Sequence, residues 1–219
     1  MADYLKLLLI RHAESVGNID GRLEGQMSTS LSRNGQWQTA QLANYLYQHQ
    51  PPPTCLYSSP LQRATETAQP LALRIGCPLR LDMGLQELHQ GIFQGLTWAE
   101  ASHRYPQICA ALITTLDYQP VPEAETPMAA HQRAVIWGQM LWQRHGPGDS
   151  VWMVTHGGFM QSLIRVILGC DRTWQIPIRH TAMFEFWLLH PDCTDGSQNN
   201  PEYWKILKFN ETPHLQLKA

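Results

Sequence analysis

Four side chains of the kind that bind and transfer a phosphoryl group each stand just behind a short apolar segment. These side chains are Arg11, His12, Arg63 and His156. A guanidinium group donates two parallel hydrogen bonds that match the spacing of phosphate oxygens. An imidazole with one unprotonated ring nitrogen can accept a phosphoryl group, and an ordinary pKa of ~6.5 leaves much of it neutral at pH 7. The residue types therefore indicate phosphoryl chemistry.

The elements that must position these side chains are predicted to be parallel strands. Residues 5–10 are nearly all apolar, which is typical of a strand buried on both faces of a parallel sheet. Residues 56–58 and 151–155 are predicted to be two further strands. Ligands of open α/β sheets bind outside the carboxyl ends of the strands, so we expect the two histidines and two arginines to meet at one edge. Gly157 and Gly158 would let a phosphate approach the start of the next helix.

Helices are predicted to alternate with these strands. Ser32 is expected to cap a helix that runs to about residue 48, and Ser59-Pro60 and Thr126-Pro127 resemble a cap followed by the first helical position. A further helix is expected over residues 159–168. Residues 181–189 and 204–209 are predicted to be strands joined by the polar loop 191–201. The order indicates an α/β fold, a three-layer sandwich with a mostly parallel central sheet and helices on both faces.

One stretch does not fit this alternation. The spacing of Trp98, Ala101 and Tyr105 favours a helix, but Pro106 and later prolines interrupt the segment. We expect residues 1–219 to form a single domain, with residues 96–125 as a small helical, cap-like insertion over the site.

Composition narrows the class of protein. Apolar residues make up 43% of the 219 residues, enough for a sizeable core, and the formal net charge of −2 argues against nucleic acid or an anionic membrane as partner. The five cysteines form no CxxC pair, which indicates reduced thiols. The run 7–10 is too short for a signal peptide or a membrane span. We expect a cytoplasmic protein that binds a small phosphorylated metabolite; a homodimer stays open.

Several motifs, in order along the chain, resemble the histidine phosphatase superfamily, which includes the cofactor-dependent phosphoglycerate mutases. The matching segments are Arg11-His12-Ala13-Glu14-Ser15 with Asn18, Ser58-Ser59-Pro60-Leu61-Gln62-Arg63-Ala64, Leu85-Gln86-Glu87, and Val154-Thr155-His156-Gly157-Gly158. The resemblance implies a phosphoglycerate mutase-like fold. It runs from Leu7 to about Gly169, which is most of the chain.

The resemblance also implies roles for individual residues. His12 is expected to be the nucleophile that becomes phosphohistidine, Glu87 the residue that transfers protons, and Glu14 a structural partner of the loop. The expected phosphate-binding residues are Arg11, Asn18, Arg63, His156 and Gly157. No Gly-Lys-Ser loop or aspartate-rich cluster is present, so guanidinium and imidazolium groups are expected to replace magnesium. We therefore predict no metal and no cofactor.

Three positions depart from the pattern of the superfamily. Ala13 stands where a glycine is usual, residues 123–126 replace a PGGES-like loop, and His180 falls where related sequences often have asparagine. These departures concern contacts on the substrate side of the site.

Three functions remain to be weighed. The first is a phosphomonoesterase in which water hydrolyses the phosphohistidine. The second is a cofactor-dependent phosphoglycerate mutase, but Leu88-His89-Gln90 lacks the Arg and Tyr usual there, and the acidic insertion has Arg104 as its firm cation. The third is a phospho-ligand binder without catalysis, which the presence of every reactive side chain argues against. The hydrolase is favoured.

Overall fold

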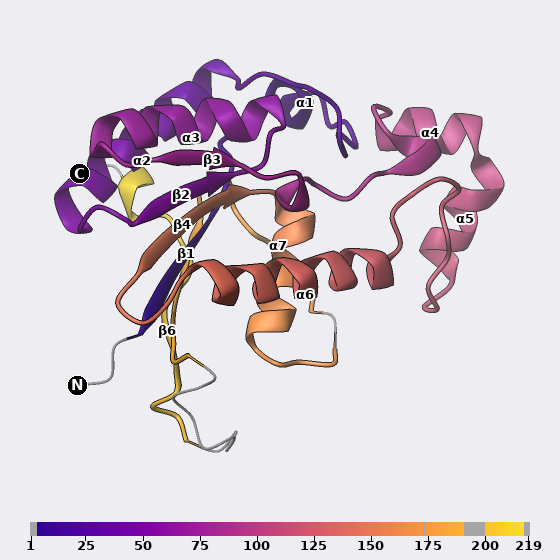
Figure 1. Ribbon diagram of the computed structural model, residues 1–219. Helices are drawn as coiled ribbons and strands as arrows, with labels where there is room; N and C mark the ends of the chain where they lie inside the picture. Colours follow the sequence, from indigo (N-terminus) through magenta and orange to yellow (C-terminus); the bar gives the residue numbers. More distant parts are fainter. Residues whose placement is uncertain (1–3, 173, 191–199, 217–219) are drawn as a thin grey trace.

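A six-stranded sheet runs through the middle of the molecule (Figure 1). The computed structural model describes residues 4–172, 174–190 and 200–216. The strands lie in the order β3-β2-β4-β1-β5-β6. Their bounds are β1 Leu5–Arg11, β2 Cys55–Ser58, β3 Leu79–Leu81, β4 Ser150–Thr155, β5 Met183–Leu188 and β6 Trp204–Glu211.

The sheet is mostly parallel, as predicted. Strands β1 to β4 pair in parallel, and β5 and β6 add an antiparallel edge. Arg11 at the end of β1 is in register with Thr155 at the end of β4, and Ser58 of β2 pairs with Val154. The residues that follow these strands therefore start from one edge of the sheet. The short strand β3 was not expected from the sequence.

Helices cover both faces of the sheet. Figure 1 shows α2 and α3 on one face and α6 and α7 on the other. Their bounds are α2 Arg33–His49, α3 Gln62–Ile75, α6 Pro127–Arg144 and α7 Gly157–Ile167. Leu7 and Leu9 of β1 belong to the core cluster with α6 and α7, whereas Leu8 and Ile10 belong to the cluster with α2 and α3. The α/β sandwich is confirmed, and β1 is buried on both faces because its side chains alternate between two cores.

The helix starts correct two predictions. Ser32 and Thr126 cap α2 and α6 as expected, since each side chain accepts a backbone N–H three residues on. Ser59-Pro60 is not a cap-and-first-residue pair, because α3 begins at Gln62 behind Leu61. Helix α7 begins at Gly157, two residues before the predicted start, because a carboxylate from another loop binds its first free N–H groups.

The loop predicted after β1 contains a short helix, α1 Val16–Ile19. It begins with a reciprocal pair of hydrogen bonds, in which Asn18 N donates to Ser15 Oγ and Ser15 N donates to Asn18 Oδ1. The polar composition hides this helix because it has a single turn and few apolar residues. The predicted loop 191–201 lies mainly outside the described residues.

The segment 96–125 contains two helices, α4 Trp98–Arg104 and α5 Pro106–Thr114. Its apolar side chains form a third cluster around Phe93, Ala101 and Cys109, apart from the two clusters of the sheet. Figure 1 shows both helices beyond the amino-terminal end of α6. None of the helices in the described part of the chain has the length and apolar character needed to cross a membrane.

A pair of helical glycines tests the packing on the two faces. At Gly35 in α2, an added Cβ would overlap the backbone carbonyl oxygen of Glu14, so Gly35→Ala should lower the free energy of unfolding by about 2 kcal/mol. At Gly138 in α6, the nearest atom to an added Cβ is Val166 Cγ1 at 3.7 Å. Gly138→Ala should therefore raise the free energy of unfolding, by up to ~1 kcal/mol, through better helix propensity. Urea unfolding of both variants checks this, and equal shifts would contradict the packing described.

Candidate active site

The nucleophile predicted from the sequence, His12, is buried at the end of β1. Its backbone N–H donates to Thr155 O, 2.9 Å away, and its ring Nδ1 lies 2.7 Å from the carbonyl oxygen of Ala13. A carbonyl oxygen can only accept, so Nδ1 carries the ring proton. The lone pair of the neutral ring is therefore on Nε2, the atom that would attack phosphorus.

Arg63 lies beside that lone pair. Its Nε donates to His12 Nε2 across 3.3 Å, and its other two nitrogens donate to Met27 O at 2.9 Å and Gly25 O at 2.7 Å. The side chain is 1% exposed although it is charged. The loop carbonyls hold the guanidinium in one orientation, and a phosphate on His12 would meet it without reorganisation.

His156 stands on the other side of His12, with 5.0 Å between the ring centroids. Its Nε2 is 2.8 Å from Ser59 Oγ, which also accepts from the N–H of Leu61 at 3.3 Å. The structure gives the hydroxyl hydrogen of Ser59 no other acceptor among the described residues, so we assign it to His156 Nε2. This assignment puts the ring proton of His156 on Nδ1, which is buried and has no partner.

Arg11 and Gly157 lie in the same site as His12, Arg63 and His156. Arg11 donates from Nη1 to Ile178 O at 2.6 Å, while its Nε is buried without a partner. Gly157 lies next to the guanidinium, since a Cβ added there would be in ordinary contact with Arg11 Nε at 3.4 Å. The structure thus brings together Arg11, His12, Arg63, His156 and Gly157, all named from the sequence.

Burial decides the charge of the two central histidines. Burial, followed by the charges of His156, Arg63 and Arg11, holds the pKa of His12 well below its usual value. Burial and then the charges of Arg63 and Arg11 do the same to the pKa of His156. Desolvation is thus the larger effect on both rings, and the neighbouring positive charges are the smaller one. Both rings are therefore neutral at pH 7.

Glu87 is held by the start of α7. Its carboxylate accepts the backbone N–H groups of Leu88 at 2.9 Å, Gly158 at 3.0 Å and Phe159 at 2.9 Å. A Cβ at Gly158 would lie 2.6 Å from Glu87 Oε1, so the contact requires glycine. Its charge also reaches the other residues of the site. Burial lowers the pKa of Arg11 and Arg63, and the charges of Glu24 and Glu87 oppose that change.

Asn18 is less directly placed than the sequence suggested. Its amide Nδ2 donates to Glu24 Oε2 at 2.8 Å and its Oδ1 accepts from Ser15 N. Asn18 is therefore linked to Arg63 indirectly, because Glu24 lies between the two side chains. Its second amide hydrogen remains for a phosphate. Glu14 accepts from Ser32 Oγ at 2.6 Å and Asn34 Nδ2 at 3.2 Å, and it supports the loop as expected.

Three supporting residues were missed in the sequence. Glu24 is buried 3.7 Å from Arg63 and accepts from the hydroxyl groups of Ser15 and Thr29. Ser59 orients His156, although the sequence suggested it as a helix cap. Arg133 donates to the carbonyls of residues 84 and 86, just before Glu87. A loop acid and a helix arginine carry no local signal of such long-range roles.

His180 is also close to the centre of the site. Its ring centroid is 6.1 Å from that of His12, and its Nε2 is buried without a hydrogen-bond partner. Among the described residues, no group of three or more His, Cys, Asp or Glu side chains is arranged to hold a metal ion.

Comparison with known proteins identifies the family of this chain. The model of the histidine phosphatase superfamily, branch 1, matches residues 7–190. A metal-independent phosphoserine phosphatase from Arabidopsis thaliana is 29% identical over 74% of this chain and 68% of its own length. Phosphoglycerate mutase-like protein 4 from the same plant is 31% identical over 98% of this chain and 88% of its own.

A solved structure of a mycobacterial glucosyl-3-phosphoglycerate phosphatase superposes with a TM-score of 0.73 at 25% identity, over 94% of this chain and 99% of that one. The family match spans both strand ends that carry the histidines, and the structural match extends to nearly the whole chain. The chain belongs to branch 1 of the histidine phosphatase superfamily and is an enzyme of its phosphatase type.

Proposed function

We propose that the chain hydrolyses small phosphate monoesters through a phosphohistidine on His12 Nε2, without a metal ion. The observation that carries the proposal is the hydrogen bond from His12 Nδ1 to Ala13 O, which leaves the Nε2 lone pair beside Arg63. In the first step the N–P bond forms while the bond from phosphorus to the ester oxygen breaks. Arg11 and Arg63 stabilise the negative charge on the phosphoryl oxygens, which is the function of magnesium in other phosphoryl-transfer enzymes.

Glu87 is proposed to move the protons. The leaving oxygen takes a proton from Glu87 in the first step, and water gives one to Glu87 in the second as it displaces His12 and forms inorganic phosphate. The three backbone donors hold the carboxylate of Glu87 in one orientation at the start of α7. The proton for the first step can arrive with the substrate, because a phosphate monoester has a second pKa near ~6.

The pairing of acidic side chains changes the argument about substrates. Four acidic residues of the insertion would be expected to repel a carboxylate, namely Glu100, Asp117, Glu123 and Glu125. Glu125 is bound at 2.7 Å by Arg133, and Glu100 lies 3.4 Å from Arg22, so both charges are partly balanced. Two of the four charges therefore argue less strongly against an ester that carries a carboxylate, as phosphoserine does. The Arabidopsis relative with that substrate in its name makes phosphoserine the first compound to test.

A phosphoglycerate mutase is the alternative, because a mutase-like protein is among the relatives. The two functions separate when phosphorylated metabolites are tested with and without 2,3-bisphosphoglycerate. A hydrolase releases inorganic phosphate without that compound, whereas a mutase requires it and releases little. The four described cysteines are free thiols, which supports a reducing compartment such as the cytoplasm.

Replacing the nucleophile should abolish turnover and covalent labelling together. His12→Ala removes the Nε2 lone pair, so hydrolysis should fall by at least about a thousandfold, and acid-labile ³²P should no longer be retained on the protein. Phosphate release and labelling are measured on protein dialysed against EDTA. Wild-type protein treated identically is the control. Turnover that survives in His12→Ala, or a wild-type enzyme that needs an added divalent metal, contradicts the mechanism.

The low pKa of His12 has a direct spectroscopic consequence. A group whose charged form is disfavoured by burial gains its proton only well below pH 6.5, so His12 should remain neutral when the pH is lowered from 7.5 to 6. Imidazole ¹⁵N chemical shifts should show a single N–H, on Nδ1, throughout this range. The signal is assigned by its loss in His12→Gln. A His12 titration centred at or above pH 6.5 would show that the ring is not buried as described.

Glu87→Gln tests the two proton transfers separately. A nitrophenolate leaves nearly unaided and an alkoxide does not, so phosphorylation of the enzyme by p-nitrophenyl phosphate should fall less than about tenfold, and by an alkyl phosphate at least about a hundredfold. Breakdown of the phosphoenzyme should also slow. Single-turnover rates separate the steps. Equal losses for both esters in the first step would assign the acid role to another group.

A further inference from the structure

His180 is the one residue of the site whose part in the reaction is not yet accounted for. It lies in the turn that leads into β5, and its ring is tilted by 41° to the His12 ring at a centroid distance of 6.1 Å. The two rings are too far apart for a direct hydrogen bond, and no bond between them is formed.

Three buried ring or guanidinium nitrogens without partners surround His12. They are Arg11 Nε, His156 Nδ1 and His180 Nε2. A buried polar nitrogen is costly unless it finds a partner, and three such atoms around one nucleophile indicate a place where a ligand supplies the acceptors. Arg11 and His156 belong to the phosphate site already described. His180 likewise has a buried nitrogen without a hydrogen-bond partner.

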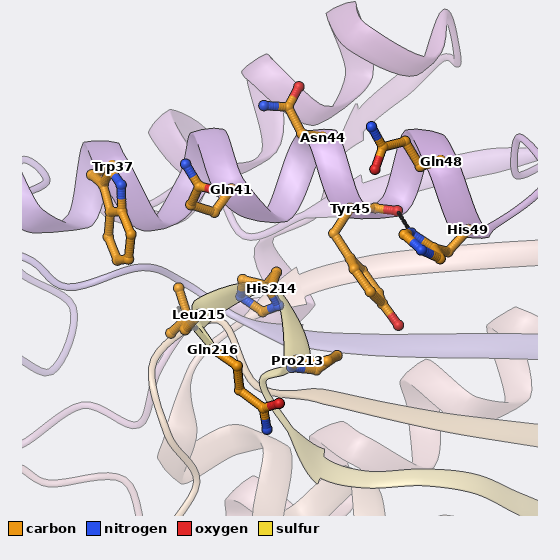
Figure 2. A pocket seen from close by; sticks show the side chains of 10 residues that line it. All are labelled: Trp37, Gln41, Asn44, Tyr45, Gln48, His49, Pro213, His214, Leu215 and Gln216. Carbon is orange, nitrogen blue, oxygen red and sulfur yellow. Dashed lines mark hydrogen bonds between the residues drawn. The ribbon is translucent and has the colours of Figure 1, made fainter. Parts of the chain in front are cut away.

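The turn that carries His180 is fastened to the catalytic strand. Thr181 has a φ of 55°, and its N–H donates to Arg11 O at 3.1 Å. Its hydroxyl donates to His180 O at 2.7 Å and accepts from His214 Nε2 at 2.8 Å. His214 stands in the wall of a surface pocket of about 620 Å³ between α2 and the short helix η4 Pro213–Leu215 (Figure 2). The turn that carries His180 is thus held on one side by β1, through Arg11 O, and on the other side by His214.

We propose that His180 Nε2–H donates a hydrogen bond to an oxygen of the phosphoryl group while that group is bound to, or transferred to, His12. This role rests on the proposed function. Burial, followed by the charge of Arg11, lowers the pKa of His180 to about 4, and Glu14 opposes the change. The ring of His180 is therefore neutral at pH 7, and the proposal assigns its one ring proton to Nε2, the buried nitrogen without a partner. Its hydrogen bond would help to orient the phosphoryl group, while Arg11 and Arg63 supply the positive charge.

The test separates a contact with the phosphoryl group from one with the leaving group. His180→Ala should weaken inhibition by orthovanadate and lower kcat/KM for both p-nitrophenyl phosphate and an alkyl phosphate, all by about ten- to a hundredfold. His180→Asn, which can still donate, should lose less. His180→Phe, which keeps a ring but no donor, should behave like the alanine variant. His103→Ala, an exposed histidine on α4, is the matched control and should resemble wild type.

Three results would overturn the assignment. One is unchanged vanadate inhibition in His180→Ala with a loss limited to one ester, which would place His180 on the leaving group. Another is wild-type behaviour of His180→Phe, which would remove the need for a donor. The third is an equal loss in the Asn and Ala variants. If the wild-type protein hydrolyses no ester, the proposed function fails. Calorimetric binding of vanadate to wild type and His180→Phe then still tests His180, and equal affinities would reject the contact.

Discussion

The hydrogen bond between His12 Nδ1 and Ala13 O determines what the rest of the site can do, because it puts the free lone pair on Nε2. The same short segment is tied to the helix that carries Arg63. Ala13 N donates to Thr67 Oγ1 at 3.0 Å, and that hydroxyl donates to Arg63 O at 2.7 Å. One threonine thus connects the nucleophile's loop to the first turn of α3. The distance between the attacking nitrogen and its guanidinium is set by backbone contacts on both sides.

Charge balance explains how two guanidinium groups can remain in this interior. Buried cations are tolerated when carboxylates and carbonyl oxygens surround them. Glu24 is 3.7 Å from Arg63, and Glu87 is close enough to affect both Arg11 and Arg63 electrostatically. The two buried histidines stay neutral, so in the proposed mechanism they act as a nucleophile and a donor without adding charge. A phosphate then completes hydrogen bonds that the protein leaves unmade.

The sequence was sufficient for the parts of the structure that local patterns control. The apolar run before His12 predicts a doubly buried strand, and the polar caps at Ser32 and Thr126 predict two helix starts; all three are confirmed. The motif residues around His12 and His156 meet as expected, because parallel strands end at one edge. What could not be predicted depends on contacts between distant segments. Glu24 and Arg133 have no local signature, and Ser59 has one that is misleading, since its hydroxyl binds a histidine 97 positions away.

The third apolar cluster gives the segment around α4 and α5 an interior of its own. Phe93, Ala101 and Cys109 pack with one another and with neighbours such as Leu23, and they do not belong to the two cores of the sheet. Two backbone hydrogen bonds connect this segment to Leu23: Leu23 N donates to Leu96 O, and Gly95 N donates to Leu23 O, both at 2.8 Å. Leu23 stands just before the loop whose carbonyl oxygens hold Arg63. The packing inside this module is therefore separate from the two cores of the sheet, whereas its position is coupled to the loop that holds Arg63.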